Sequence, residues 1–377
     1  MPTDWIIVGA GFTGATFAER MATAGKRVLV VDRRAHIAGN AYDDKNGHGI
    51  LVHRYGPHIF HTNSAAVWKY LSKYTKWRSY EHRVLGLIEG KLVPIPFNLD
   101  SLAALFEAPD ARRIESALVN QYGLGKKVPI LKLRESEDPE IREFAGYVYR
   151  NVFEGYTVKQ WQLRPEELSP SVTARVPVSI SRDDRYFQDT YQAMPLHGYT
   201  EMFRRMLDHP NIEVVVDCEW RYLATIDNNA SVLFTGAIDE FLDFRFGPLP
   251  YRSLRFEERT LMERQHQQVG TVNYPNNHDY TRITEQKIIT GQEAPVTTLI
   301  TEYSRPHEPG KTIAYYPIPR DENQLLYAKY ATAAKAEFPR VHFAGRLADY
   351  QYYNMDQACA RALKLASEHG GPAWPSP

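Results

Sequence analysis

The stretch that decides the fold is WIIVGAGFTG, at residues 5–14. Its apolar start, residues 5–8, has the length and the β-branching of a strand that is buried on both faces. A helical pattern follows over residues 15–24, and after Gly25 a second buried strand covers residues 27–31. Strand, glycine turn, helix and strand form a complete βαβ unit. The chain is therefore expected to begin with a parallel-sheet domain of the α/β class.

The glycines of this stretch have the spacing GxGxxG, and each has a physical task. Gly9 makes the tight turn, Gly11 lets the backbone reach a pyrophosphate at the helix N-terminus, and Gly14 allows the helix close to the sheet. Asp32 ends the second strand 18 residues after Gly14, where it can accept a hydrogen bond from a ribose hydroxyl. Because the glycines lie between a predicted strand and a predicted helix, a chance glycine loop is a poor alternative. We predict a dinucleotide-binding loop, and the fingerprint itself leaves FAD and NAD open.

Composition and charge exclude several other classes of protein. The 377 residues include 45 Lys and Arg against 45 Asp and Glu, so no overall positive field exists to hold nucleic acid. Cys218 and Cys359 stand far apart and outside any CxxC motif, which excludes a disulfide framework and a thiolate zinc site. His58 and His61 lack a third ligand at a helpful spacing, so no metal is expected. Without a basic N-terminal region or an apolar run near the roughly 20 residues of a membrane span, we expect a soluble cytoplasmic protein.

The rest of the chain divides into segments of different texture. Residues 99–143 carry alternating charges around a helical apolar pattern, whereas residues 244–316 contain short, aromatic-rich, alternating pieces typical of antiparallel strands. Buried-strand patterns return at residues 212–216 and 231–236, and a closing helix is predicted over residues 355–369. The expected boundaries are 1–60, 205–243 and 325–377 for a discontinuous Rossmann-like domain, 98–165 for an inserted helical domain, and 61–97, 166–204 and 244–324 for an antiparallel β-sheet domain that holds the substrate.

Two later segments favour FAD over NAD alone. Arg33 and Arg34, followed by a Gly39-Asn40 turn, resemble the flavoprotein extension of the glycine motif. The segment from Gly345 to Asp356 resembles the flavin-facing end of the same superfamily, where a helix N-terminus would stabilise negative charge on a reduced ring. The expected cofactor-binding residues are Gly9, Gly11, Phe12, Thr13, Gly14, Asp32, Arg33, Gly39, Asn40, His58, Gly345, Arg346, Met355 and Asp356.

Further blocks, in a fixed order, resemble the UDP-galactopyranose mutase family. They are HRYGPHIFHT at residues 53–62, PIPFNL at 94–99, EGYTVKQW at 154–161, DYTRITE at 279–285 and AYYP at 314–317. The resemblance covers nearly the whole chain and is much more specific than the glycine loop. It implies a flavoenzyme, an isomerase that interconverts UDP-galactopyranose and UDP-galactofuranose. In that mechanism N5 of reduced FAD attacks the anomeric carbon and displaces UDP.

The resemblance also implies roles for individual residues. Arg175 and Arg282 would be the essential arginines on the substrate diphosphate, and His61 would lie near the flavin. His82 stands where other members carry Asn, which leaves its role open. The residues implied to contact the substrate are Phe153, Tyr156, Trp161, Tyr186, Tyr315, Tyr350 and His82.

These residues also make sense without the family. A nucleotide sugar carries two adjacent phosphates, which planar Arg donors and Tyr hydroxyls bind through charge-assisted hydrogen bonds. The alternatives are surface ion pairs for the arginines, ordinary buried rings for the tyrosines, and core packing for Trp161. At the level of function, the alternatives are an amine-oxidase-like FAD oxidoreductase and a nucleotide-sugar or flavin-binding module without chemistry. The sequence leaves open the reductant of the flavin, homo-oligomer formation and tolerance for other nucleotide sugars.

Overall fold

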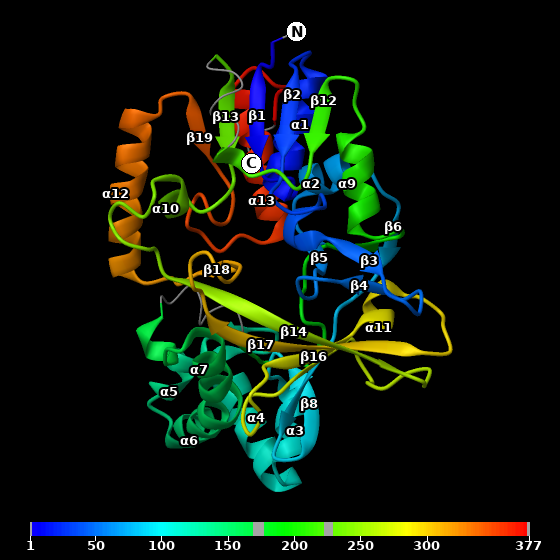
Figure 1. The fold of residues 1–377 in the computed structure, drawn as a ribbon. Coiled ribbons are helices and arrows are strands. Elements are labelled where there is room, and N and C mark those ends of the chain that lie inside the picture. The colour runs from blue at the N-terminus through cyan, green and yellow to red at the C-terminus, as the bar shows by residue number, and fades with distance from the viewer. Residues whose placement is uncertain (1, 169–176, 222–228, 375–377) are drawn as a thin grey trace.

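The computed structural model describes residues 2–168, 177–221 and 229–374, and it has three parts stacked along one axis (Figure 1). A parallel sheet with helices lies at one end, a long antiparallel sheet crosses the middle, and a group of helices lies at the other end. The fold is α/β, with a Rossmann-like domain into which the helical and antiparallel parts are inserted. The sequence-based prediction of the fold class is therefore confirmed.

The parallel sheet has the order β12-β2-β1-β13-β19, with the first strand of the chain at its centre. Each pair in the sheet is parallel, and Ile7 lies between Val30 and Leu233 in the register. The strands are β1 (Trp5–Val8), β2 (Val28–Val31), β12 (Ile212–Val215), β13 (Ser231–Phe234) and β19 (Val341–Phe343). Residues 212–216 were predicted to be a buried strand, but β12 is an edge strand with an exposed Val215 because it has a neighbour on one side only.

Helices α1 (Phe12–Thr23) and α13 (Met355–Glu368) pack against each other and form the core of this part with the sheet. Phe17 and Met21 of α1 are fully buried there, as is Ala362 of α13. Helices α2 and α9 pack into the same core, beside a three-stranded sheet of order β5-β11-β6. These elements are α2 (Ala65–Leu71), α9 (Tyr199–Leu207), β5 (Phe60–Thr62), β6 (Trp77–Ser79) and β11 (Tyr191–Pro195).

The antiparallel sheet has seven strands in the order β18-β14-β17-β16-β15-β7-β8, in which β15 and β7 are the parallel pair. The longest strand pair of this sheet is β14 with β17, whose antiparallel pairing runs from Arg252 opposite Pro306 to Leu261 opposite Thr297. The strands are β7 (Val84–Ile88), β8 (Lys91–Ile95), β14 (Tyr251–Leu261), β15 (Thr271–Asn273), β16 (Arg282–Glu285), β17 (Thr297–Pro306) and β18 (Tyr316–Pro317). The sequence predicted short strands over residues 244–316, but β14 and β17 in this region are long.

The helical part begins at a capping box, in which the Asn98 side chain accepts from the N–H of Ser101 and the Ser101 hydroxyl accepts from the N–H of Asn98. Ile114, Ile141 and Phe144 form its core. Its elements are α3 (Leu99–Leu105), α4 (Ala108–Tyr122), β9 (Lys127–Val128), α5 (Ile130–Arg134), α6 (Pro139–Val148), a π-helical turn η2 (Tyr149–Glu154), α7 (Gly155–Trp161), η3 (Pro165–Glu167) and β10 (Val178–Ser179).

The remaining elements lie between these parts or at their sides. They are η1 (Gly39–Ala41), β3 (Asp43–Lys45), β4 (Leu51–His53), α10 (Ile238–Phe241), α11 (Gln286–Thr290) and α12 (Asp321–Glu337). Among them, α11 packs against β17 and β4. In the described part of the chain, none of the helices combines the length and the apolar character that a membrane crossing requires.

Because α1 lies so close to β1 and the glycine loop, we predict that adding one methyl group at Gly14 strongly destabilises the fold. A Cβ on Gly14 would lie 1.8 Å from the Gly9 carbonyl oxygen and 3.1 Å from Cγ2 of Ile7. Because the oxygen belongs to the backbone, the helix must shift, and we expect Gly14→Ala to lower the free energy of unfolding by about 3 kcal/mol or more. Urea denaturation measures this change. Gly47→Ala, whose Cβ would have open space, should change it by less than about 0.5 kcal/mol, and equal values for the two variants would contradict the prediction.

Candidate functional site

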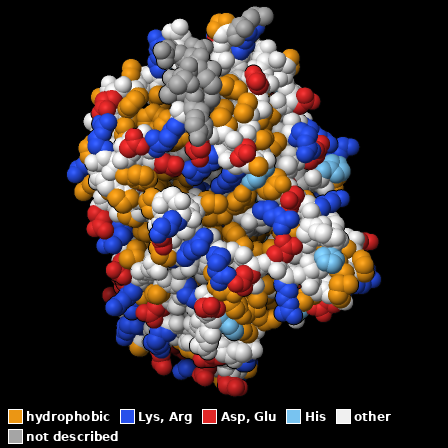
Figure 2. Space-filling view, viewed as in Figure 1, with side chains coloured by type: hydrophobic (Ala, Val, Ile, Leu, Met, Phe, Trp, Pro, Cys, Tyr) orange, Lys and Arg blue, Asp and Glu red, His pale blue; other side chains and the backbone are white. Residues whose placement is uncertain are grey.

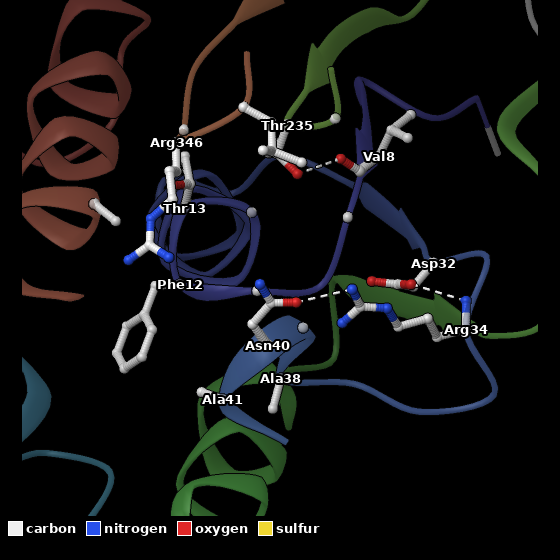
Figure 3. Close-up of a pocket in the computed structure, with 18 of the residues that line it drawn as sticks. Val8, Phe12, Thr13, Asp32, Arg34, Ala38, Asn40, Ala41, Thr235 and Arg346 are labelled. Carbon is white, nitrogen blue, oxygen red and sulfur yellow. Dashed lines mark hydrogen bonds between the residues drawn. The ribbon is translucent and has the colours of Figure 1, made fainter. Parts of the chain in front are cut away.

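The glycine loop forms the floor of a cavity at the carboxyl ends of the parallel strands (Figure 3). Gly9 has a φ of +105°, and its N–H donates to the carbonyl of Val31 at 2.8 Å. A Cβ on Gly9 would lie 2.1 Å from Oγ1 of Thr235, a hydroxyl that itself donates to the carbonyl of Val8 at 2.8 Å. Gly11 is the N-cap of α1 and offers no capping side chain. The first N–H groups of α1 therefore meet the cavity, where they favour an anion.

This glycine-loop cavity contains most of the expected cofactor residues. Of that set, those lining it are Gly9, Gly11, Phe12, Thr13, Gly14, Asp32, Arg33, Gly39, Asn40, His58, Gly345, Arg346 and Met355. Asp356 does not line it, and its carboxylate accepts from the Thr62 hydroxyl at 2.8 Å. In this structure Asp356 thus joins α13 to β5, and its contact with a cofactor stays a prediction.

Asp32 and Arg34 place opposite charges at the edge of the cavity. The Asp32 carboxylate accepts from the N–H of Ala10 and from the N–H of Arg34, both at 2.9 Å, so it joins the glycine loop to the end of β2. The Arg34 guanidinium lies over the Tyr55 ring at 4.4 Å and donates to Oδ1 of Asn40 at 2.8 Å. Its Nη1 is buried without a hydrogen-bond partner. An unpaired guanidinium nitrogen in a cavity is a place for an anionic or hydroxylated ligand.

A second, larger hollow, the central cavity, continues from the glycine-loop cavity and lies between the parallel and antiparallel sheets. On the face seen in Figure 2, the surface is hollowed between these two parts, and Lys and Arg side chains lie beside the hollow. The residues shared by both cavities are Asn40, His58, Tyr315, Arg346, Asn354 and Met355. Arg346 at this junction is held by two hydrogen bonds to the carbonyl of Tyr353, at 3.0 and 2.5 Å.

Arg282 enters the central cavity from β16. Its Nε and Nη2 lie 2.9 and 2.8 Å from Oε2 of Glu302, a carboxylate with only 2% of its surface exposed. The other carboxylate oxygen of Glu302 accepts from the Thr281 hydroxyl at 3.1 Å. A buried carboxylate thus fixes the guanidinium plane, and the planar fork keeps further N–H groups for an anion. This ion pair lies inside the site, so the alternative of a surface ion pair is wrong for Arg282.

Tyrosines surround the same space. Tyr156, Tyr186 and Tyr315 line the central cavity as expected. Burial raises the pKa of Tyr156 and of Tyr315 above the ordinary value, so both hydroxyls stay protonated at neutral pH. Neutral hydroxyls can donate to phosphate oxygens without adding negative charge.

The structure does not bring Tyr350 to the site. Its ring is fully buried beside Tyr251, and its hydroxyl donates to the carbonyl of Pro250 at 2.6 Å. Tyr352, two residues later, lines the central cavity and stacks on Tyr316 with ring centroids 5.1 Å apart. The tyrosines that line the central cavity in place of Tyr350 are Tyr316 and Tyr352. The doublet of adjacent tyrosines at residues 315 and 316 was the sequence signal for the first of these.

Two expected histidines line the central cavity with their rings held by neighbours. Nδ1 of His61 lies 3.0 Å from Oδ2 of Asp189, and the ring stacks on Phe187 at 3.6 Å. Nδ1 of His82 lies 3.0 Å from the Tyr80 hydroxyl. Phe187 is a lining residue that the sequence analysis did not single out.

His58 stands at the junction of the two cavities and is held from both sides. Its Nδ1 donates to the carbonyl of Gly56 at 2.9 Å, because a carbonyl can only accept. Its backbone N–H donates to Nδ1 of the fully buried His53 at 3.1 Å. His53 therefore carries its proton on Nε2 and fixes the loop that brings His58 to the junction.

A third, apolar cavity opens from the central one towards the helical part. Tyr156, Trp161, Tyr186 and Asn273 line both. Its other walls are Gly86, Ile95, Ile130, Val152, Phe153, Thr157, Pro165, Leu168 and Pro275. Phe153 and Trp161, both expected to contact the substrate, thus lie together beside Tyr156. An aromatic, apolar space next to a buried arginine suits a flat heterocycle attached to a charged group.

Some elements of the prediction have no structural counterpart to report. Arg175 lies outside the described residues. Among the residues that the structure describes, no three His, Cys, Asp or Glu side chains are grouped in a way that could hold a metal ion. The lining residues that sequence reasoning missed include Tyr55, Tyr316, Phe187, Asn273, Tyr352 and Asn354.

Comparisons with known proteins find mutases of nucleotide sugars along nearly the whole chain. A family model described as UDP-galactopyranose mutase matches residues 151–352, and a model of an NAD(P)-binding Rossmann-like domain matches residues 7–74. A Klebsiella pneumoniae protein named "Probable UDP-galactopyranose mutase" is 36% identical over 96% of this chain and 94% of its own length. A dTDP-fucopyranose mutase of Escherichia coli is 34% identical over 96% of this chain and 97% of its own length. A crystal structure of a reduced UDP-galactopyranose mutase has the same fold, with a TM-score of 0.74 at 14% identity over 98% of this chain and 94% of that chain.

The buried histidines of the site predict acid sensitivity. Burial lowers the pKa of His53 to about 4, and burial with nearby positive groups lowers the pKa of His58 and of His82 to about 3. Below the ordinary pKa of about 6.5 the unfolded chain binds protons that the folded protein refuses, so stability falls as the pH falls. Each histidine contributes a slope that approaches about 1.4 kcal/mol per pH unit near pH 5, and the contribution of His53 falls to about half of that at pH 4, where the folded protein begins to take up its proton.

Replacing one of them tests this account. His82→Asn should reduce the slope of unfolding free energy against pH by about 1.4 kcal/mol per unit below pH 6. Urea denaturation between pH 7 and pH 4.5 measures the slope, and the exposed His48→Asn serves as the control. Parallel curves for His82→Asn and the parent protein would contradict the prediction.

Proposed function

Since the chain belongs to the UDP-galactopyranose mutase family, we propose that it interconverts UDP-galactopyranose and UDP-galactofuranose with the help of bound FAD. The observation that carries the proposal is the junction between the glycine-loop cavity and the central cavity. Arg346, His58 and Tyr315 line both. A dinucleotide that starts at the glycine loop can therefore present its far end to a ligand held by Arg282.

The residues of the glycine-loop cavity fit FAD. The N-terminus of α1 with Gly11 would receive the pyrophosphate, Asp32 a ribose hydroxyl, and the unpaired Nη1 of Arg34 a further polar atom. A Cβ on Gly11 would meet only the Gly39 Cα, at 3.7 Å, so the space in front of Gly11 belongs to the cavity. Arg346 and the start of α13 would face the flavin end, where positive charge favours the anionic reduced form.

When bound and reduced, the flavin would supply through N5 the nucleophile that displaces UDP from the anomeric carbon. The chain's own residues would hold the other partner. Arg282 is oriented by Glu302 and would pair with the diphosphate, while the neutral hydroxyls of Tyr156 and Tyr315 donate to its oxygens. Arg175 is proposed to share this task. UDP held in this way stays in place for its return to the sugar, which limits loss by hydrolysis.

The apolar cavity is proposed to take the base of the nucleotide. Its rings, Phe153, Tyr156 and Trp161, are flat surfaces for a pyrimidine. Because a dTDP-fucopyranose mutase is about as similar to this chain as a UDP-galactopyranose mutase, both nucleotide sugars belong in the test. We propose the uridine nucleotide as the substrate.

The mutase reaction produces an isomer, so it consumes no electrons, and this predicts how activity depends on the flavin. Protein reduced anaerobically with dithionite should convert UDP-galactofuranose to UDP-galactopyranose over many turnovers per flavin, as measured by chromatography. Air-oxidised protein should be nearly inactive, because oxidised N5 has no electron pair suited to attack on carbon. Arg282→Ala should reduce turnover about 10- to 200-fold, because it removes one charge-assisted contact to the diphosphate. The variant should keep its FAD.

Four outcomes would contradict the proposal. Equal activity of oxidised and reduced protein, or loss of reducing equivalents in step with conversion, would favour the amine-oxidase-like alternative. Faster conversion of dTDP-fucopyranose than of UDP-galactopyranose would reassign the substrate. Binding without formation of an isomer would favour a module without chemistry.

The cofactor assignment predicts that one added side chain in the glycine loop prevents FAD from binding. Gly11→Val would place a branched side chain where the pyrophosphate approaches, so FAD content, measured as flavin absorbance per chain, should fall at least about 10-fold. Gly47→Val, at an open turn, is the matched control. Circular dichroism checks the fold.

Thiol chemistry gives an independent measure of FAD binding. Cys218 lines the glycine-loop cavity, whereas Cys359 is fully buried in the core. Added FAD should therefore lower the rate of Cys218 alkylation in the parent protein. In Gly11→Val, added FAD should leave that rate unchanged. A folded Gly11→Val protein with full FAD content would remove the assignment.

A further inference from the structure

Lys159 on α7 has an unusual set of partners. Its Nζ donates to four backbone carbonyls, those of Tyr274, Asn276 at 3.2 Å, His278 at 3.0 Å and Tyr280 at 3.2 Å. We call these four oxygens the carbonyl cage. An ammonium group has three hydrogens to share among them, and four carbonyl dipoles that converge without a cation would repel one another. The ammonium is therefore what allows this loop conformation.

The cage belongs to the loop between β15 and β16. Every second residue of the loop turns its carbonyl inward, and the rings of Tyr274, His278 and Tyr280 pack together outside, with centroids 4.8 to 5.0 Å apart. The loop thus coils around the end of one side chain. Its shape is set by Lys159, which comes from another part of the fold.

The same loop is docked on the helical part at two further points. Nδ2 of Asn276 donates to the carbonyl of Asn151 at 2.9 Å. A Cβ on Gly155 would lie 2.5 Å from the carbonyl oxygen of Pro275, so glycine permits close approach of α7 to the loop. Lys159 is the charged member of this contact.

Both sides of the contact carry walls of the candidate site. Tyr156 and Trp161 lie on α7 with Lys159, while Asn273 and Arg282 flank the caged loop. Lys159 itself lines none of the three cavities described above. The distance between the aromatic wall and the arginine wall therefore depends on the cage.

We propose that Lys159 is a positioning residue for the nucleotide, which sets the spacing between the wall of Tyr156 and Trp161 and the wall of Asn273 and Arg282. The inference rests on the proposed function only in taking UDP as the ligand. Its chemical content is that a half-buried ammonium, without touching the ligand, holds a heterocycle-binding wall and a phosphate-binding wall in register.

A second lysine whose ammonium donates to backbone carbonyls provides the control. Nζ of Lys287 donates to the carbonyls of Ala294 at 2.7 Å and Val296 at 3.1 Å. Lys287 is buried, lies on α11 and lines none of the three cavities. Loss of its ammonium should cost stability in a similar way without moving the walls of the site.

The experiment measures UDP binding to the oxidised holoprotein by titration calorimetry, so it does not depend on turnover. Lys159→Met should raise the Kd of UDP about 10-fold, whereas Lys287→Met should leave it within about twofold. With reduced enzyme, Lys159→Met should raise KM for the nucleotide sugar about 10-fold and change kcat less than about threefold. Ammonium chloride should restore UDP binding to Lys159→Ala, and sodium chloride at the same concentration should not.

The outcomes separate the two proposals. Parent protein that fails to bind UDP overturns the proposed function and this inference with it. Parent protein that binds UDP, together with a folded Lys159→Met variant of unchanged Kd, overturns the inference alone. If Lys159→Met does not fold, Asn276→Ala detaches the loop from Asn151 without removing the ammonium, and it should raise the Kd about threefold. An unchanged Kd in Asn276→Ala counts against the inference.

Discussion

The close approach of the first helix to the central strand is the constraint on which the rest of this structure depends. Gly14 lies so near Gly9 that a methyl group would be 1.8 Å from a backbone oxygen. This contact lets α1 begin directly beyond the end of β1, so its free N–H groups lie at the carboxyl edge of the parallel sheet. The Asp32 carboxylate and the segment around Gly39 and Arg34 are arranged around that helix start.

Electrostatics give the second half of the site its character. The central cavity contains a guanidinium whose counterion, Glu302, is buried behind it, and rings that stay neutral at physiological pH. Glu302 orients Arg282 and compensates its charge when no anion is bound. The neutral state of His82 and Tyr156 follows from burial, which disfavours the charged form of each. A dianionic diphosphate would therefore meet neutral donors and a guanidinium that Glu302 holds from behind.

The inserted parts are joined to one another through the buried Arg252 and the half-buried Lys159. Arg252 of β14 donates from Nε to the carbonyl of Gln160 at 2.8 Å, and Lys159 fills the carbonyl cage one residue earlier. Both contacts use the positive charge of a side chain to satisfy carbonyl oxygens that secondary structure leaves unpaired. The end of α7 is consequently fixed to the antiparallel sheet from two sides. These contacts therefore fix the position of Tyr156 and Trp161, the aromatic wall of the apolar cavity.

The sequence by itself determined the local parts of this protein. The βαβ unit, the glycine loop, Asp32 and the closing helix follow from short-range patterns, because buried strands and glycine turns have steric requirements that neighbouring residues express. Arg282 was identifiable through its block. The strands that pair over long distances were less visible: residues 212–216 look buried in isolation, but β12 has a neighbour on one side only.

Only the tertiary structure decided which side chains of a segment face the site. Tyr350 and Tyr352 are equivalent in a sequence pattern, yet Tyr350 has a φ of +48° and turns its hydroxyl to Pro250, while Tyr352 lines the central cavity. Asp356 lies in the first turn of the predicted helix, but its carboxylate accepts from the Thr62 hydroxyl. The carbonyl cage of Lys159 joins residues more than 110 positions apart. These features depend on how distant segments pack, and pairwise contacts between distant segments leave no periodic signal in a single sequence.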